Sequence, residues 1–365
     1  MKNPDWVVRA GGGGGGTLNR RLFLSAFGLS LVASKAGAAC AQPITELLGV
    51  TFSADGTRLA VAGKGGFRVF RQIAPNKWTS ETGAQGNDFD YAVSFAPHGQ
   101  MLAVGCSDGT VEMRDSNRSM RLQTMANLSM SAIAFSPDGG MLAAVGCRLN
   151  RGSPNPLVGI AEVWDVSTGR RLAALGVSPY TLNCVAFSPD GKRIAVGGAG
   201  LHAVLELWDI STETRLRRLE TAASSAAPKS SSFNTWIWAV VFSPDGSTLI
   251  ASDSGGSKGH YTSALESWDV ASGRRVKVVI GDFRVAYSPN GDTRAQASES
   301  LPGWKVDLYS VPTGGRKTTF LVNSAVHSMC FSPTGDMLAC GTSGCTVDIW
   351  RVATGNHLTT LNINR

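Results

Sequence analysis

One short motif recurs along nearly the whole chain and restricts the folds available to it. Phe-Ser-Pro-Asp-Gly, or a close variant, begins at seven positions that lie 40 to 55 residues apart: Phe52, Phe95, Phe135, Phe187, Phe242, Tyr287 and Phe331. Self-similarity at such a period is the signature of repeat architectures. In the motif, proline presets a turn dihedral, aspartate bonds its own backbone and glycine accepts a positive φ. The motif therefore predicts a tight turn in every repeat.

Short apolar segments around each turn predict four β-strands per repeat. In the fourth copy, residues 185–187 precede the turn, residues 193–196 follow it, and residues 205–208 alternate apolar and acidic side chains before an aromatic. A second tight turn then leads to a fourth strand. A single four-stranded antiparallel sheet cannot bury both of its faces, whereas sheets packed radially cover each other and protect their edges. We therefore expect an all-β fold.

The third predicted strand ends in a distinctive dipeptide. Its copies are Trp164-Asp165, Trp208-Asp209 and Trp268-Asp269, with Trp350-Arg351 as a degenerate version. Together with the repeat spacing, this pattern resembles the WD40 repeat family over about residues 44–363, although the Gly-His pair that usually opens a WD40 repeat is missing. The resemblance implies a seven-bladed β-propeller of four-stranded antiparallel blades. Because the first recognisable strand is an inner one and the last an outer one, we expect one contiguous repeat per blade.

The N-terminal residues 1–41 have the composition of an export signal. Six glycines (11–16) precede Arg20-Arg21, an apolar run and a small-residue region, with candidate cleavage sites after Ala38 or Ala41 and a possible lipidation site at Cys40. This order of charge, short apolar run and small residues is typical of a signal peptide, and the paired arginines resemble a twin-arginine signal. The apolar run is too short to span a bilayer. We expect residues 42–365 to form the propeller and to be periplasmic or otherwise extracytoplasmic; a retained leader would make the protein cytoplasmic.

The basic charge of the chain is concentrated in this leader. Lys and Arg number 34 against 27 Asp and Glu, a net charge of +7. Residues 1–41 hold five basic residues and one acidic residue, so the remainder has 29 against 26, a net charge of +3. So small an excess does not indicate a nucleic-acid partner.

A cation stands seven residues after most aromatics that end a third strand, as in Trp164/Arg171, Trp208/Arg215 and Trp268/Arg275. Across a hairpin these positions lie nearly opposite each other, so the cation could cover the ring. An acidic residue two positions before the aromatic, such as Glu162, shares that sheet face and could form an ion pair. We interpret these arginines as structural; a basic rim for nucleic acid or acidic lipid is the alternative.

Insertions relative to the shortest repeats concentrate in two kinds of connection. Residues 148–159, 255–263 and 299–303 lie between second and third strands, and residues 83–88 and 222–235 lie between successive repeats. Antiparallel alternation places both kinds on one face, which we call the long-loop face. Long loops on a rigid scaffold commonly carry recognition residues. The partner-binding candidates are Asn150, Arg151, Asn155, Trp236, Trp238, His260, Tyr261 and Trp304.

No local catalytic or metal-binding motif is present, so neither catalytic residues nor a cofactor are predicted. The five histidines lack paired zinc spacing, and no nucleophile or phosphate-binding motif occurs. Cys340 and Cys345 flank a short connection and are the one pair whose spacing suggests a disulfide. Our first hypothesis is a non-catalytic, monomeric scaffold that binds a protein on the long-loop face. The alternatives are an extracytoplasmic propeller enzyme, lactonase-like or cofactor-dependent, with its site at the central channel, and a cytoplasmic assembly factor.

Overall fold

The computed structural model describes residues 46–364, with gaps at 86–89, 107–108, 116–118, 124–127, 150–156, 177–180, 201–202, 222–233, 258–259, 281–282 and 301–302. All of these residues belong to one compact unit, Ala41–Arg365. The expected export signal, including Arg20 and Arg21, lies outside the described residues.

The described residues form 28 β-strands, which we group in chain order into seven quartets. The first three quartets are β1(Glu46–Phe52), β2(Arg58–Lys64), β3(Gly66–Ala74) and β4(Lys77–Gln85); β5(Asp90–Phe95), β6(Leu102–Cys106), β7(Thr110–Arg114) and β8(Ser119–Gln123); and β9(Leu128–Phe135), β10(Met141–Leu149), β11(Leu157–Asp165) and β12(Arg171–Gly176). The fourth and fifth quartets are β13(Thr181–Phe187), β14(Arg193–Gly200), β15(Val204–Asp209) and β16(Thr214–Arg218); and β17(Asn234–Phe242), β18(Thr248–Ser257), β19(His260–Asp269) and β20(Arg275–Ile280). The last two quartets are β21(Phe283–Tyr287), β22(Thr293–Ser300), β23(Gly303–Ser310) and β24(Arg316–Val322); and β25(Val326–Phe331), β26(Met337–Thr342), β27(Thr346–Arg351) and β28(His357–Asn362).

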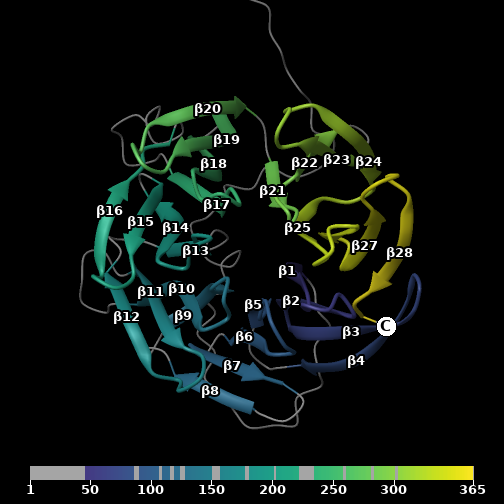
Figure 1. The fold of residues 1–365 in the computed structure, drawn as a ribbon, viewed down its shortest axis with the longest axis horizontal. Helices are drawn as coiled ribbons and strands as arrows, with labels where there is room; N and C mark the ends of the chain where they lie inside the picture. The colour runs from purple at the N-terminus through teal and green to yellow at the C-terminus, as the bar shows by residue number, and fades with distance from the viewer. Residues whose placement is uncertain are drawn as a thin grey trace, which may run out of the picture. The chain divides into compact units, whose positions relative to one another are not determined.

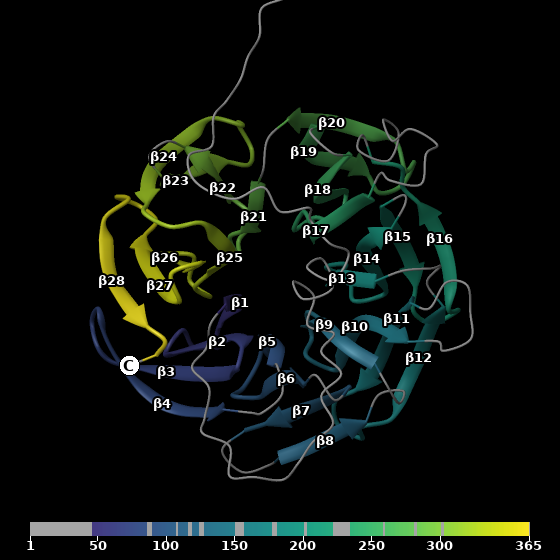
Figure 2. The same ribbon diagram turned by 180° about the vertical axis from the view of Figure 1, so that it is seen from behind.

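Within every quartet, consecutive strands pair antiparallel, so each sheet is formed from contiguous chain, as expected. The first strands β1, β5, β9, β13, β17, β21 and β25 lie innermost around a common centre, and the fourth strands lie outermost (Figures 1 and 2). The prediction of seven separate sheets is confirmed only in part. Among the described residues there are five four-stranded sheets and one eight-stranded sheet, which joins the fourth and fifth quartets through β14 and β17.

These two quartets are joined where the end of β14 meets the start of β17. Ala199 and Gly200 at the end of β14 pair with Trp236 and Thr235 at the start of β17. This approach depends on Gly197, because a Cβ atom there would lie 2.5 Å from Cγ2 of Ile237. Glycine permits close approach of two backbones. Gly105 and Gly341 allow a similarly close approach of the next inner strand without joining their sheets. Gly197 therefore permits the pairing, which is made by the end of β14 and the start of β17.

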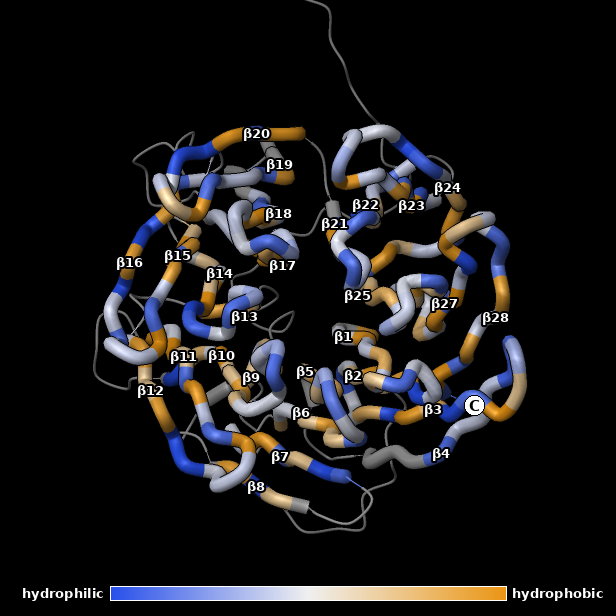
Figure 3. Tube along the Cα trace, viewed as in Figure 1, coloured by the Kyte–Doolittle hydropathy of each residue, from blue (hydrophilic) through white to orange (hydrophobic). Residues whose placement is uncertain are grey.

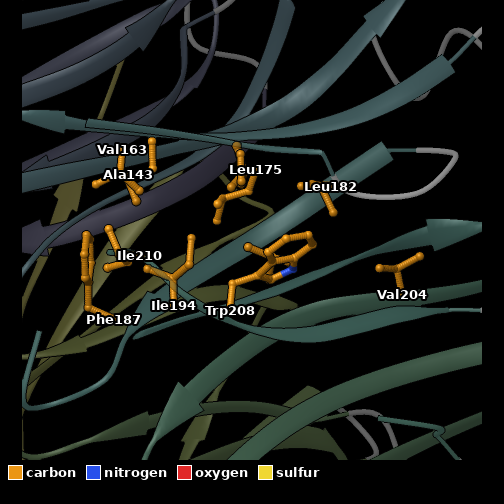
Figure 4. Packing of buried hydrophobic residues seen from close by; sticks show 13 residues of the cluster. Ala143, Val163, Leu175, Leu182, Phe187, Ile194, Val204, Trp208 and Ile210 are labelled. Carbon is orange, nitrogen blue, oxygen red and sulfur yellow. The ribbon is translucent and has the colours of Figure 1, made fainter. Parts of the chain in front are cut away.

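The apolar core lies between neighbouring sheets. Hydrophobic residues recur along the strands of each quartet (Figure 3). At the junction of the third and fourth quartets, Phe187, Ile194 and Trp208 face Val163 and Leu175 of the preceding sheet (Figure 4). Burial of one such side chain stabilises the fold by about 1.5–3 kcal/mol. Each sheet is therefore stable only because its neighbours cover it.

The first and last quartets close the ring by the same kind of packing. Phe52 and Leu59 share a buried cluster with Ala339 and Ile349. The Ser328 hydroxyl also accepts a hydrogen bond of 3.2 Å from the Val50 backbone N–H. Each of these two sheets is formed only from the four strands of its own quartet. The ring is therefore closed by side-chain packing and not by a strand that the first and last quartets share.

Each recurrent turn is a small hydrogen-bonded unit that also contacts the next turn. In the third repeat, the Ser136 hydroxyl donates to Asp138 at 2.5 Å, and Asp138 accepts from the Gly140 N–H at 3.0 Å. These bonds lower the pKa of the Asp138 carboxyl. A proline of one turn packs on the turn glycine of the following repeat. A Cβ atom built on that glycine would lie 2.5–4.0 Å from the nearest atom of the proline. The six pairs are Pro97/Gly139, Pro137/Gly191, Pro189/Gly246, Pro244/Gly291, Pro289/Gly335 and Pro333/Gly56.

The first repeat breaks this pattern, which leads to a prediction. It has Ala54 in place of proline, and a Cβ atom on Gly99 of the next turn would have no neighbouring atom within 4 Å. The Ala54 N–H donates no hydrogen bond within the described part of the chain. Ala54→Pro should therefore stabilise the fold by about 0.4–1 kcal/mol, mainly by restricting the unfolded chain. Thermal unfolding should show a melting temperature raised by about 1–3 °C, with Ala54→Ser unchanged as the control; a lower value for the proline variant would contradict the prediction.

Candidate protein-interaction face

The antiparallel order of the quartets places the insertions at one end of the strands. The Ser-Pro-Asp-Gly turns and the turns between third and fourth strands lie at the opposite end. Part of the predicted loops is regular structure. β18 extends to Ser257 and β19 begins at His260, and these two residues pair directly. The described part of the insertion at 255–263 is therefore a lengthened hairpin, because residues 255–257 pair with residues 260–262 across the strands.

The structure separates the eight partner-binding candidates. Asn150, Arg151 and Asn155 lie outside the described residues. The backbones of His260 and Tyr261 belong to the extended end of β19. The remaining three candidates, Trp236, Trp238 and Trp304, belong to strands β17 and β23.

Trp304 contributes to the core more than to an exposed face. It is half-buried at the start of β23 and packs against the apolar cluster between the sixth and seventh quartets. The sequence places Trp304 directly after the predicted loop at 299–303, which is why it is a partner-binding candidate. The register that pairs it with Glu299 on β22 instead turns the indole toward the core.

Trp236 and Trp238 form an aromatic cluster on the innermost strand β17. Their rings stack with centroids 6.3 Å apart and planes at 22°. Trp238 is 38% exposed, and its indole N–H donates to the Ser254 hydroxyl at 2.7 Å. The Arg284 guanidinium lies 5.8 Å from the Trp238 ring centroid. A rigid, partly exposed aromatic with a neighbouring cation is typical of interaction hot spots.

A recurrent bulge explains why Trp238 projects from its strand. Six inner strands shift their pairing register four residues before the motif aromatic, so that the register skips one residue in each. These residues are Leu48, Tyr91, Ser131, Asn183, Trp238 and His327. Bulges re-aim side chains and recur at functional edges. In the sequence, each of these residues stands four positions before the aromatic of its motif. The bulge itself could be recognised only once the strand register was known.

The arginines of the fourth strands pair with buried acids. The distances are 2.9 Å for Arg171–Glu162, 2.8 Å for Arg215–Glu206 and 3.0 Å for Arg275–Glu266, and all three glutamates are fully buried. Each arginine lies directly opposite a tryptophan in the register, as expected. The predicted ring contact is not among the cation–π contacts of the described residues. The arginines therefore neutralise buried carboxylates, which supports the structural interpretation.

This pairing predicts that Arg171→Ala destabilises the fold. The variant leaves the fully buried Glu162 carboxylate without its cation, whereas the arginine itself is 41% exposed. We expect the free energy of unfolding to fall by about 1–3 kcal/mol. Arg170→Ala removes the neighbouring exposed cation and is the matched control. Chemical denaturation of both variants measures the difference, and equal stabilities would show that the ion pair is not needed.

The aspartates of the repeated Trp-Asp dipeptides have a turn-forming role. Asp165 accepts hydrogen bonds from the Ser167 hydroxyl at 2.7 Å and the Thr168 N–H at 2.8 Å. These bonds lower the pKa of the Asp165 carboxyl to about 2. Asp209 and Asp269 accept equivalent bonds. Trp164, Trp208 and Trp268 are buried, and Trp350 is half-buried and stacks on Phe320.

The described residues show no metal-binding cluster and contradict the suggested disulfide. No group of three or more His, Cys, Asp or Glu residues in the described ranges could hold a metal ion. Cys340 is buried in β26 and Cys345 lies in the following turn with a φ of 54°, and no disulfide joins them. The bridge fails because the Cys340 side chain points into the apolar core. Among these same residues no helix is long and apolar enough to cross a membrane.

Comparison with known proteins identifies the repeats. Residues 86–115, 175–209 and 315–351 match the WD40 family, described as "WD domain, G-beta repeat". The chain carries WD40 repeats. The WD repeat-containing protein slp1 of Schizosaccharomyces pombe is 25% identical over 305 residues, which cover 77% of this chain and 55% of that protein. SEC12-like protein 1 of Arabidopsis thaliana is 29% identical over 183 residues, 49% of this chain and 44% of that protein.

The chain thus spans about half the length of these curated relatives. A solved structure titled Kuenenia stuttgartiensis Hydrazine Synthase is similar with a TM-score of 0.67 at 15% identity, covering 88% of this chain and 99% of that one. At this identity the similarity shows the fold alone. WD40 repeats in a propeller-like arrangement of four-stranded sheets are typical of proteins that mediate protein interactions.

Proposed function

We propose that this WD40-repeat protein is a non-catalytic scaffold that binds a protein partner through its long-loop face. The observation that carries the proposal is the partly exposed Trp238, stacked on Trp236 and placed by a bulge on an innermost strand. A preorganised aromatic loses little conformational entropy on binding and can bury a large area. We count the seven quartets as seven blades, two of them joined by hydrogen bonds, and infer a monomeric propeller.

Affinity capture from the native host with mass spectrometry tests the scaffold. The wild type is compared with Trp238→Ala and with a variant whose 148–159 and 222–235 segments are shortened to the turns of other repeats. A specific protein should be retained by the wild type and lost by the still-folded variants. For the purified pair, Trp238→Ala should weaken binding at least about tenfold, the effect of a hot-spot residue. Equal capture by all three proteins would exclude the long-loop face.

We further propose that residues 1–41 direct export to the periplasm through a twin-arginine-type signal. The proposal is supported by Arg20-Arg21 followed by a short apolar run and small residues. Fractionation of host cells should place the wild type outside the cytoplasm and shortened by cleavage after Ala38 or Ala41. The Arg20→Lys/Arg21→Lys variant should remain cytoplasmic at full length, and export of that variant would contradict a twin-arginine route.

A further inference from the structure

The fifth quartet ends at the outermost strand β20, whose outer side is open. Among the described residues β20 pairs with β19 alone, so the backbone groups on its other side have no strand partner. Such an edge is a template for the addition of a further extended segment. β20 lies outermost in the ring and is largely hydrophobic in colour (Figures 1 and 3). We call residues 274–278, which are all exposed, the β20 edge.

Two exposed valines distinguish the β20 edge from the outer strands of the other quartets. Val276 is 59% exposed and Val278 is 38% exposed. Val278 stands ten positions after Trp268, and at this position the other six repeats have polar, charged or small residues: Ser80, Thr124, Ala174, Arg218, Thr319 and Thr360. Polar and charged side chains on an outer strand discourage pairing with a foreign strand. β20 lacks this protection.

The two valines have no role in the interior of the protein. Neither belongs to an apolar cluster of the described residues, although Trp268 and Val279 beside them do. Val278 lies opposite the buried Glu266 in the register. In the last two quartets the corresponding residue is a threonine whose hydroxyl donates to the acid opposite, in the pairs Thr319/Asp307 and Thr360/Asp348. A valine makes no such bond, so its exposed surface is available to a partner.

The β20 edge also carries a cation without a counter-charge. Arg275 pairs with the buried Glu266 at 3.0 Å, and Arg274 acts on the carboxylate of Asp269. Lys277 stands between the two valines, and within the described part of the chain its side chain makes no ion pair or hydrogen bond. Charge therefore favours an acidic partner at this edge.

The same charge argues against a second copy of this strand as the occupant. β20 contains Arg275 and Lys277 and no acidic residue. Two copies would place like charges in one sheet, which destabilises cross-strand pairing. An added strand with an acidic residue opposite Lys277 and apolar residues on either side of it matches both the charge and the valines of the edge.

We propose that the β20 edge binds an acidic, extended segment of a partner protein by β-strand addition, with a carboxylate beside Lys277 and apolar side chains beside Val276 and Val278. In this mode backbone hydrogen bonds supply affinity and alternate side chains supply specificity. Trp238 belongs to β17, and the strands β18 and β19 lie between it and β20, which is a separation of about 14 Å at the usual strand spacing. The β20 edge is thus separate from the Trp238 surface, and its binding does not rest on the function proposed above.

Selection from a displayed library of random heptapeptides on the immobilised full chain tests the proposal. We expect enrichment of peptides in which an acidic residue stands between two apolar ones. By fluorescence anisotropy, a selected peptide should bind Lys277→Glu at least about tenfold more weakly than the wild type. The same loss is expected for Val276→Lys/Val278→Thr, which gives β20 the residues of β24 at these positions. Ile73→Thr removes a 54% exposed isoleucine from the first quartet and should bind as the wild type does.

N-methylated peptides separate strand addition from docking by side chains alone. In an added strand, every second backbone N–H donates to the edge and the others point away from it. Methylation of one alternate set of amides should abolish binding, and methylation of the other set should leave it unchanged. Loss of binding with both sets, or with neither, would overturn strand addition.

Two further measurements separate this proposal from the scaffold function and from lost structure. Trp238→Ala should keep peptide binding, so failure of the long-loop face and failure of the β20 edge are distinguishable. Both β20 variants should melt at the temperature of the wild type, because the replaced side chains are exposed. No enrichment, enrichment of basic peptides, or equal binding to the β20 variants would overturn the proposal. A wild-type dimer in sedimentation that Val276→Lys/Val278→Thr abolishes would also overturn it and would assign the edge to a second copy.

Discussion

Trp268→Ala is expected to lower the free energy of unfolding by about 3–5 kcal/mol. The Trp268 side chain is 1% exposed and belongs to the cluster between the fourth and fifth quartets, with Leu249 and Ala251 beside it. The truncation removes a large buried ring and leaves a cavity that strands on both sides cannot fill. Because each sheet depends on its neighbours for burial, the loss should affect the whole ring. Urea denaturation, followed by circular dichroism, measures it.

A matched variant separates burial from residue type. Trp238→Ala removes the same ring from a site that is 38% exposed. It should cost much less stability, since less apolar surface is lost, while it should weaken partner binding. If the two variants lost equal stability, the assignment of Trp268 to the core and Trp238 to an interaction surface would be wrong.

Gly197→Val is expected to destabilise the protein by about 2–3 kcal/mol through overpacking. A Cβ atom at Gly197 would lie 2.5 Å from Cγ2 of Ile237 and 2.7 Å from Sγ of Cys184. Ile237 is β-branched and fully buried, so it has little freedom to move away. The added side chain should also separate β14 from β17. Amide hydrogen exchange should then show lost protection at Thr235 and Trp236.

Gly176→Ala is the control for this prediction. No atom lies within 4 Å of a Cβ position at Gly176, which is the exposed end of β12. Its stability should match that of the wild type within about 0.5 kcal/mol. A Gly197→Val variant as stable as this control would show that the close approach of β14 and β17 is not required.

Several features of the fold could be predicted from local sequence chemistry. The recurrent turn specified where first and second strands meet, because proline, aspartate and glycine at fixed offsets favour one backbone path. The alternation before Trp208 identified a third strand, and the spacing of Trp208 and Arg215 placed them opposite each other. These predictions succeeded because turn dihedrals and strand periodicity depend on residues close in sequence.

The candidate site was only partly predictable, because it depends on contacts between residues that are far apart in sequence. Loop length pointed to the end of the strands where Trp236 and Trp238 lie, but it also suggested Trp304, which packs against the core. Of the two contacts expected for Arg171, the ion pair with Glu162 is formed and the cation–π contact is not, because a fully buried carboxylate attracts the guanidinium more strongly than a ring does. Exposure and electrostatic competition depend on neighbours that the sequence does not place.

The amino-acid sequence thus specified the repeating element, namely strands, turns and the aromatic that ends each third strand. The tertiary structure decided how neighbouring repeats meet. The end of β14 pairs with the start of β17 and joins two quartets into one sheet, and Arg294 and Gln296 make the junction between the fifth and sixth quartets polar. At the junction that Arg294 and Gln296 make polar, the difference lies in single residues at positions that are apolar in the other repeats. Their effects appear only when segments about 40 to 55 residues apart in the chain are packed against each other.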